Sequence, residues 1–176
     1  SSDLGKSTTA INLSACLAEK GKKVLAIDMD PQGNTTSGFG VDKNGIENTL
    51  YELLLGEAET KDTIVKDVVE NLDLIPSNIN LSGAEIELVG IDDKEFILKG
   101  ITDKLRRKYD YIILDCPPSL NMLTINALTA ATSVLVPIQC EYYALEGLSQ
   151  LIHTIDLVKE RLNKRLKMEG DRKSVV

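Results

Sequence analysis

Four short apolar runs divide the chain, and each of them is continuous rather than alternating. They cover residues 23–28, 72–76, 111–115 and 133–137. Continuous apolar character is typical of strands that are covered on both faces, as in a parallel sheet. The runs therefore predict an α/β fold with a mostly parallel sheet and helices on both of its faces.

Two other segments have helical periodicity. Between Lys6 and Lys20 the apolar side chains fall mostly on one face, and Gly21 supplies a stop. Between Ala144 and Leu162 apolar residues recur at helical spacing. Strands that alternate with helices predict βαβ units with right-handed crossovers, and a chain of 176 residues fits one domain, residues 1–176.

Composition and charge exclude several classes of protein. No apolar run approaches the ~20 residues that a membrane-spanning helix needs, and no basic-then-apolar leader opens the chain, so we expect a cytoplasmic protein. The three cysteines, Cys16, Cys116 and Cys140, form no CxxC pair, which argues against a zinc or redox site. We expect them to be small buried apolar residues. The net charge of −7 gives no support of its own to nucleic-acid binding.

The first candidate site residues are Gly5, Lys6, Ser7 and Thr8, which open the first predicted helix. The start of a helix presents free backbone N–H groups and the positive end of the helix dipole, so it suits phosphate. Gly5 lets the backbone approach a phosphate, Lys6 can reach the terminal phosphates, and the Ser7 hydroxyl can ligate Mg²⁺. An ordinary capped helix remains the alternative for this motif alone.

Two carboxylates, Asp28 and Asp30, lie at the carboxyl end of the first predicted strand, the run at residues 23–28. Open α/β sheets bind ligands at the carboxyl ends of their strands. Strand periodicity places both side chains on one side, so one can hold Mg²⁺ and the other can orient an attacking water. A polar turn formed by residues 31–33 is the alternative.

Asp115, followed by Cys116, Pro117 and Pro118, ends another apolar run in the manner of a Walker B acid. A loop without a ligand is again the alternative. Taken together, the helix start and the strand ends predict that four residues converge around one magnesium-bound polyphosphate. They are Lys6, Ser7, Asp30 and Asp115. Ser7, Asp30 and Asp115 are the candidate metal ligands.

These motifs resemble the ParA/Soj/MinD superfamily, and most of all the chromosomal ParA (Soj) proteins. The matching stretches are residues 5–13, 28–34 with 36–38, 75–78, 115–119 and 141–147. The resemblance implies a P-loop NTPase-like fold and a weak Mg²⁺-dependent ATPase that forms an ATP-dependent homodimer. It also implies nonspecific DNA binding, association with the nucleoid, and a ParB-type centromere-binding partner that stimulates hydrolysis.

The same resemblance assigns a role to each matching residue. Lys6 would bind phosphate, Ser7 would ligate Mg²⁺, Asp30 would orient the attacking water, and Asp115 would be the Walker B acid. The loops around Asn34 and Pro117 would be the switches that sense the terminal phosphate. Catalysis is thus assigned to Lys6, Asp30 and Asp115, and ATP binding to Gly5, Lys6, Ser7, Thr8, Asp30 and Pro117.

One departure concerns the phosphate loop, which reads KGGxGK[ST] in the family. Ser1, Ser2 and Asp3 occupy the positions of its Lys, Gly and Gly. Either the binding of ATP between the two subunits of the dimer is impaired, or these residues do not reflect the native loop. We also expect a strand encoded before Ser1 and more α/β structure after Gly170, so that the chain lacks its first strand and its C-terminal part.

Three other functions compete with a partition ATPase. A non-hydrolysing nucleotide- or DNA-binding scaffold is suggested by the altered loop at residues 1–3. A MinD-like membrane ATPase disagrees with the local motifs, and an iron–sulfur carrier would need a paired cysteine motif. We expect no membrane partner.

Overall fold

The main sheet has four strands in the order β2-β3-β1-β4. The computed structural model describes residues 4–137 and 144–169. The strands are β1 (Val24–Asp28), β2 (Val65–Val69), β3 (Leu72–Ile75) and β4 (Tyr111–Asp115). β1 pairs in parallel with β3 and β4, whereas β2 is antiparallel to β3. The prediction of a mostly parallel sheet is therefore confirmed.

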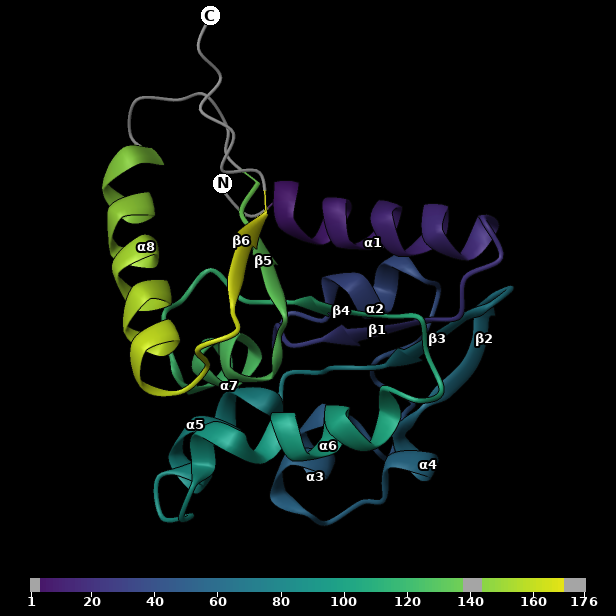
Figure 1. Cartoon of the computed structure of the whole chain (residues 1–176). Helices are drawn as coiled ribbons and strands as arrows, with labels where there is room; N and C mark the ends of the chain where they lie inside the picture. The colour runs from purple at the N-terminus through teal and green to yellow at the C-terminus, as the bar shows by residue number, and fades with distance from the viewer. Residues whose placement is uncertain (1–3, 138–143, 170–176) are drawn as a thin grey trace, which may run out of the picture.

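Helices cover both faces of this sheet (Figure 1). One face carries α1 (Leu4–Glu19) and α2 (Asn34–Gly38). The other carries α3 (Leu50–Leu55), α5 (Leu81–Leu88), α6 (Ile97–Leu105) and α7 (Met122–Ala130). The short elements α4 (Thr60–Thr63) and η1 (Lys94–Phe96) join these helices to the sheet and to each other.

Alternate residues of β1 divide the core into two layers. Leu25 and Ile27 pack with α3, α5, α6 and α7, and all of these contacts are buried. Val24 and Ala26 pack on the other side, against Ala18 of α1 and the buried leucines of β3. Because both faces of β1 are covered, its sequence is continuously apolar, as the run at residues 23–28 predicted.

The predicted strand at residues 133–137 differs from its expected place. It is β5 (Ser133–Leu135), and it pairs with β6 (Lys167–Glu169) in a separate two-stranded sheet beside α8 (Ala144–Arg161). We did not predict β6, because three exposed residues leave no apolar pattern to recognise. β4 is also less covered than expected, since it pairs only with β1 among the described residues and its centre is half-buried.

The expected burial of the cysteines is wrong for Cys16, which is exposed on α1. It lies on the side of this helix that faces away from the sheet, where no core packing is available to bury a side chain. Cys116 is half-buried, and Cys140 lies outside the described residues. Within the described part of the chain, no helix is both long enough and apolar enough to cross a membrane.

A closed circuit of buried hydrogen bonds shapes the loop that follows β1. The Asp28 carboxylate accepts from the backbone N–H of Asp30 (3.1 Å) and from both the N–H and the hydroxyl of Thr36 (2.7 Å each). The Ser77 N–H donates to the Thr36 hydroxyl (2.9 Å), and the Ser77 hydroxyl donates to the Asp30 carbonyl (2.8 Å). The Asp28 carboxylate is therefore used inside the protein, and it is not one of two functional carboxylates as its spacing suggested.

Burial raises the pKa of Asp28 to about 6 from its ordinary 3.8, although the hydrogen bonds from Thr36 and Asp30 oppose the rise. The folded protein then binds a proton that the unfolded chain has released, so stability contributed by this group falls as the pH rises from about 4 to about 6. We expect the unfolding free energy, relative to Asp28→Asn, to fall by about 2 kcal/mol over this range. Urea denaturation of both proteins in EDTA checks this, and a difference that does not vary with pH contradicts it.

Gly33 precedes α2 with a φ of 63°, and a Cβ atom there would lie 3.0 Å from the Ser77 carbonyl oxygen. We expect Gly33→Ala to destabilise the fold by more than Gly40→Ala. Gly40 is the matched control because its φ of 77° carries the same strain while its surroundings are open. Strain alone costs about 1–2 kcal/mol. The two unfolding free energies in urea decide the matter, and equal losses would show that the contact with Ser77 is unimportant.

Candidate functional site

The carboxyl ends of β1 and β4 place two aspartates side by side. Asp28 and Asp115 are partners in the parallel register of these strands. The Met29 N–H donates to the Asp115 carbonyl (2.9 Å), which carries the pairing one residue beyond β1. Both loops that leave these strands therefore begin at the same point on the edge of the sheet, where open α/β sheets bind ligands.

Asp115 accepts a hydrogen bond from one hydroxyl group and lies close to a second. Thr35 Oγ1 donates to its Oδ2 atom (2.6 Å), and the Ser7 hydroxyl is near enough to lower the pKa of the same carboxyl. Burial raises the pKa of Asp115, and the charge of Asp30 adds to the rise, whereas both hydroxyls and the charge of Lys6 oppose it. The structure thus brings Lys6, Ser7, Asp30 and Asp115 into one electrostatic neighbourhood.

The first turns of α1 carry Gly5, Lys6, Ser7 and Thr8. The Gly5 carbonyl accepts from the Thr9 hydroxyl (2.6 Å), so this end of the helix is formed in the described structure. Lys6 and Ser7 are half-buried and Thr8 is exposed. The altered loop residues Ser1–Asp3 lie outside the described residues, so the structure does not test their expected effect.

A pocket of about 380 Å³ opens beside Asp30, between the two loops. Its lining residues are Asp30, Pro31, Gln32, Asn34, Ser82, Pro117, Pro118, Ser119 and Asn121. Asp30 Oδ1 accepts from the Gln32 N–H (2.9 Å), which orients its carboxylate at the start of the loop. The loops predicted around Asn34 and Pro117 therefore face each other across one cavity.

The donor atoms in this neighbourhood suit Mg²⁺. Ser7, Asp30 and Asp115 offer one hydroxyl and two carboxylates, and all of these are oxygen ligands. In the described part of the chain, no group of three or more His, Cys, Asp and Glu side chains could form a metal site. Mg²⁺ does not need one, because it usually keeps several waters and takes only one or two carboxylates, together with phosphate oxygens.

Sequence reasoning missed the residues that hold the site in place. Thr35, Thr36 and Ser77 each bond to an acidic residue or its loop, yet none was given a role. The sequence did contain a signal for them, because all three are small hydroxyl residues in the segments that follow the buried strands β1 and β3. The matching stretch at residues 141–147 lies largely outside the described residues, so its expected role is untested.

Comparison with known proteins agrees with this geometry. The sequence profile of the AAA domain family matches residues 3–168. The chain is 56% identical over 167 residues to the sporulation initiation inhibitor protein Soj of Bacillus subtilis, covering 95% of this chain and 66% of that protein. It is 54% identical to the chromosome partitioning protein ParA of Myxococcus xanthus, covering 95% of this chain and 59% of that protein. The chain thus spans about two thirds or less of the length of these relatives.

Solved structures give the same result. A cobyrinic acid a,c-diamide synthase from Mycobacterium smegmatis, with a bound ATP analog and magnesium, superposes with a TM-score of 0.89 at 42% identity, covering 93% of this chain and 67% of that one. A plasmid partition protein from Borrelia burgdorferi gives a TM-score of 0.81 at 35% identity, covering 96% and 72%. The chain therefore belongs to the AAA domain family and, within it, to the ParA/Soj group.

Proposed function

We propose that residues 1–176 carry the nucleotide-binding domain of a Mg²⁺-dependent ATPase that acts as a switch in chromosome or plasmid partition. The observation that carries the proposal is that α1 packs against β4, so that Ser7 and Lys6 of its first turns lie close enough to Asp115, at the end of β4, to lower the pKa of that carboxyl. This packing joins an anion-binding helix end to an acidic strand end. The names of the relatives, which are chromosome and plasmid partition proteins, support the biological role.

In this proposal α1 binds the phosphates of ATP. The backbone N–H groups at Gly5, Ser7 and Thr8 and the ammonium group of Lys6 provide positive charge at the start of the helix. Mg²⁺, when bound, neutralises charge on the phosphates. Ser7 and Asp115 hold the ion, either directly or through its waters.

Asp30 accepts a hydrogen bond from the attacking water and orients this water toward the terminal phosphate. Its carboxylate borders the pocket, and its backbone is fixed by Ser77 on one side and Asp28 on the other. This rigidity matters because the contribution of such a residue depends on positioning. Pro117 lies across the same pocket, and its loop senses whether the terminal phosphate is present.

The finer parts of the proposal are an ATP-dependent homodimer, nonspecific DNA binding, and stimulation by a ParB-type centromere-binding protein in the cytoplasm, at the nucleoid. The identities of 56% and 54% to Soj and ParA support them. Steady-state ATP turnover, measured with and without DNA and the ParB-type partner, tests the set. Absence of turnover under every one of these conditions would refute the ATPase.

A non-hydrolysing nucleotide- or DNA-binding scaffold is the second candidate, because Ser1, Ser2 and Asp3 replace the Lys, Gly and Gly of the family loop. Isothermal titration with ATP and ADP separates the two functions. A scaffold binds both nucleotides with similar affinity, whereas a switch prefers the triphosphate. The variant with Ser1→Lys, Ser2→Gly and Asp3→Gly should strengthen ATP binding, because it removes a negative charge and two side chains near the phosphates.

We expect Lys6→Ala to weaken ATP binding and to lower turnover by at least about a hundredfold, because a charge-assisted contact to the phosphates is lost. Lys20→Ala is the matched control, since Lys20 is an exposed lysine just beyond the other end of α1. Titration calorimetry and a phosphate-release assay provide the measurements. If both alanine variants behave like the unchanged protein, α1 does not bind the phosphates.

Asp30→Ala should behave differently from Lys6→Ala. We expect turnover to fall by about a hundredfold or more while ATP affinity changes less than tenfold, because Asp30 acts on the water rather than on the nucleotide. Asp62→Ala, at an exposed position of α4, is the control for removal of a carboxylate. Single-turnover hydrolysis with saturating ATP measures the effect. A large loss of affinity without a loss of rate would reassign Asp30 to binding.

A further inference from the structure

A second cavity, of about 260 Å³, lies at the edge of the main sheet opposite the candidate site. Its lining includes Lys23, directly before β1, Asn71, directly before β3, and Tyr109, two residues before β4. Asp30 and Pro117 of the candidate site lie instead just beyond the ends of β1 and β4. Because β1, β3 and β4 are parallel, the amino ends of all three strands meet at this second cavity.

Two basic segments converge on the second cavity. Residues 20–23 and 104–110 carry seven lysine and arginine side chains against one carboxylate, on Asp110. The first residues of β1 and β4 are partners in the parallel register, so these two segments lie side by side where the strands begin. Two hydrogen bonds fix them there: the Lys23 N–H donates to Asp110 Oδ2 and the Asp110 N–H donates to the Lys23 carbonyl (2.8 Å each). In a chain of net charge −7, positive charge is thus concentrated at one edge of the sheet.

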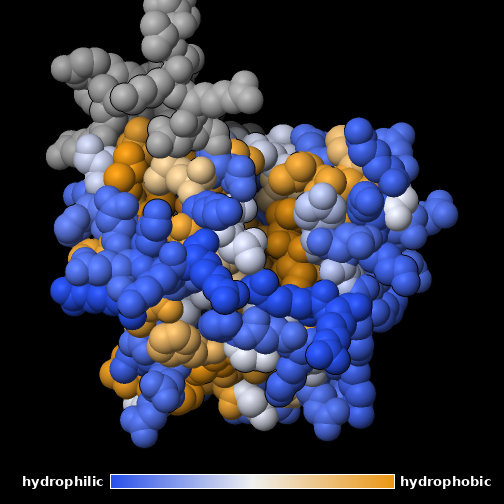
Figure 2. All heavy atoms as spheres, in the orientation of Figure 1, coloured by the Kyte–Doolittle hydropathy of each residue, from blue (hydrophilic) through white to orange (hydrophobic). Residues whose placement is uncertain are grey.

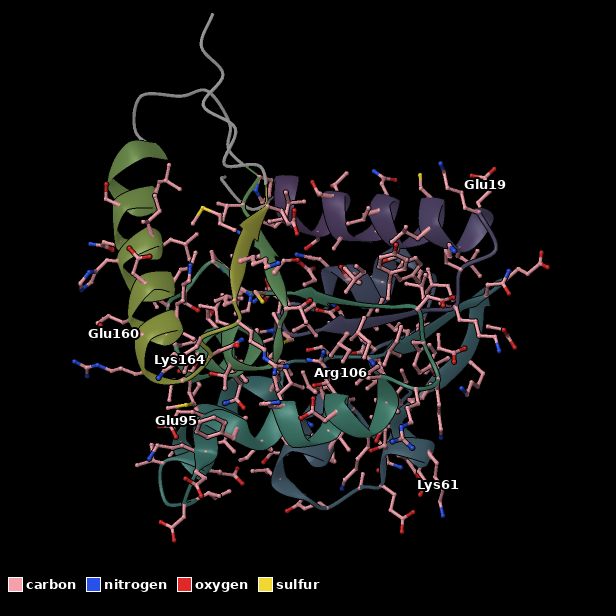
Figure 3. All side chains as sticks on the ribbon, viewed as in Figure 1. Glu19, Lys61, Glu95, Arg106, Glu160 and Lys164 are labelled. Carbon is pink, nitrogen blue, oxygen red and sulfur yellow. The ribbon has the colours of Figure 1, made fainter. Side chains whose placement is uncertain are left out.

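Only part of this charge faces the cavity. Arg106, labelled in Figure 3, is paired elsewhere, because its Nε lies 2.9 Å from Asp103 Oδ1 and its Nη2 donates to the Ala130 carbonyl (2.9 Å). Lys23 and Lys108 line the cavity, and among the described residues neither ammonium group has an ion pair or a hydrogen bond. Hydrophilic residues cover most of the right-hand edge of the molecule in Figure 2, where these segments lie. Two exposed lysines therefore leave their charge available to a ligand.

Lys66, the third lysine of the cavity, is held in place by two neighbours. Its Nζ atom donates to Asp73 Oδ2 (2.6 Å) and to the Tyr109 hydroxyl (3.0 Å), and lies 5.5 Å from the centre of the Tyr109 ring. The Tyr109 hydroxyl and the Asp67 N–H also donate to the Asp73 carboxylate. Burial opposes the ionisation of Asp73, yet the hydrogen bonds from Lys66 and Tyr109 outweigh it and hold its pKa below the ordinary 3.8. Asp73 is therefore a carboxylate, and the charge of Lys66 neutralises it.

The remaining charges of the cavity favour an anion. After Lys66 and Asp73 neutralise each other, Lys23 and Lys108 supply two positive charges against the single carboxylate of Asp67. A concave surface with an excess of one sign of charge raises the local concentration of the opposite ion. Lysine is a common ligand of phosphate, whose oxygens accept charge-assisted hydrogen bonds from ammonium groups. Cavities that enclose drug-sized ligands measure ~300–1,000 Å³, so this one fits a smaller anion.

We propose that the second cavity is a binding site for a small anion that carries a phosphate group. The phosphate lies between the ammonium groups of Lys23 and Lys108, with Lys66 fixed beside it. The side-chain amide of Asn71, which lines the same cavity, bonds a hydroxyl group of the ligand where the phosphate is esterified. Free phosphate and a small phosphate ester share this chemistry. The proposal does not rest on the partition switch, because none of these residues belongs to the site around Asp30.

Size and charge favour a small anion over a nucleic-acid duplex. A duplex extends well beyond the cavity, so it also meets the negative charge of the remaining surface, which gives the chain its net charge of −7. A small anion stays within about 10 Å of the lysines, which is the range over which their charge acts at ~0.1 M salt. The shape adds a further restriction, because the lysines line a hollow and not a flat surface.

Lysine reactivity tests the site residue by residue. The full chain is acetylated with acetic anhydride, with and without glycerol 3-phosphate or inorganic phosphate, and each lysine is quantified by peptide mass spectrometry. We expect Lys23, Lys66 and Lys108 to react at least about threefold more slowly with the anion bound, because a hydrogen-bonded ammonium group is less available. Lys22 and Lys104, in the same basic segments but outside the cavity, should react at the same rate. The anion that protects at the lower concentration identifies free phosphate or an ester as the source.

A pair of double variants separates the cavity from the general effect of charge. In Lys23→Ala/Lys108→Ala we expect half-protection of Lys66 to need at least about ten times more anion, because two contacts to the phosphate are lost. Lys22→Ala/Lys104→Ala is the matched control, since it removes two exposed lysines of the same segments that do not line the cavity. Half-protection of Lys66 in this control should stay within about twofold of the unchanged protein.

Three results would overturn the proposal. They are unchanged reactivity of Lys23 and Lys108 in the presence of either anion, equal half-protection in the two double variants, or protection of the same lysines by a DNA duplex but by neither small anion. The last result would assign the second cavity to nucleic acid. Lys6 is scored in the same spectra, so a failure of phosphate binding at α1 is recognised separately and leaves these outcomes readable.

Discussion

The buried carboxylate of Asp28 is the interaction on which the site depends. It connects β1 to α2 through Thr36, and Thr36 connects in turn to Ser77, after β3. Ser77 returns to the carbonyl of Asp30, whose own N–H is bonded to Asp28. Since a buried polar group without a partner costs about 1–3 kcal/mol, each member of this circuit holds the others in place. The backbone of Asp30 is consequently bonded at both its N–H and its carbonyl group.

Asp115 lies beside Asp28 in the sheet but has partners of another kind. Asp28 is bound partly by backbone N–H groups, which cannot turn away without unfolding the loop. Asp115 accepts from the hydroxyl of Thr35 and lies near that of Ser7, and the oxygen atoms of both hydroxyls can themselves ligate a cation. Of two adjacent buried carboxylates, Asp28 is therefore committed to the fold, and in the proposed function Asp115 is the one that exchanges its partners for a metal.

The loop after β4 connects this chemistry to the surface of the protein. Its residues line the pocket beside Asp30, and Asn121 joins the loop both to α7 and, through Glu85, to α5. The pocket is thus joined to α5 by a single hydrogen-bonded side chain.

By itself, the sequence determined the parallel strands, because strands covered on both faces must be continuously apolar, and it placed Asp30 and Asp115 at their ends. It could not distinguish Asp28 from Asp30, since residues two apart in a strand share one side. Only the position of Thr36 in space shows that the Asp28 carboxylate is hydrogen-bonded within the fold. Nor could it find β6, whose three residues are exposed, or place β5 in a separate sheet. Those features were decided by the tertiary structure, because hydrogen-bond partners and strand neighbours come from segments far apart in the chain.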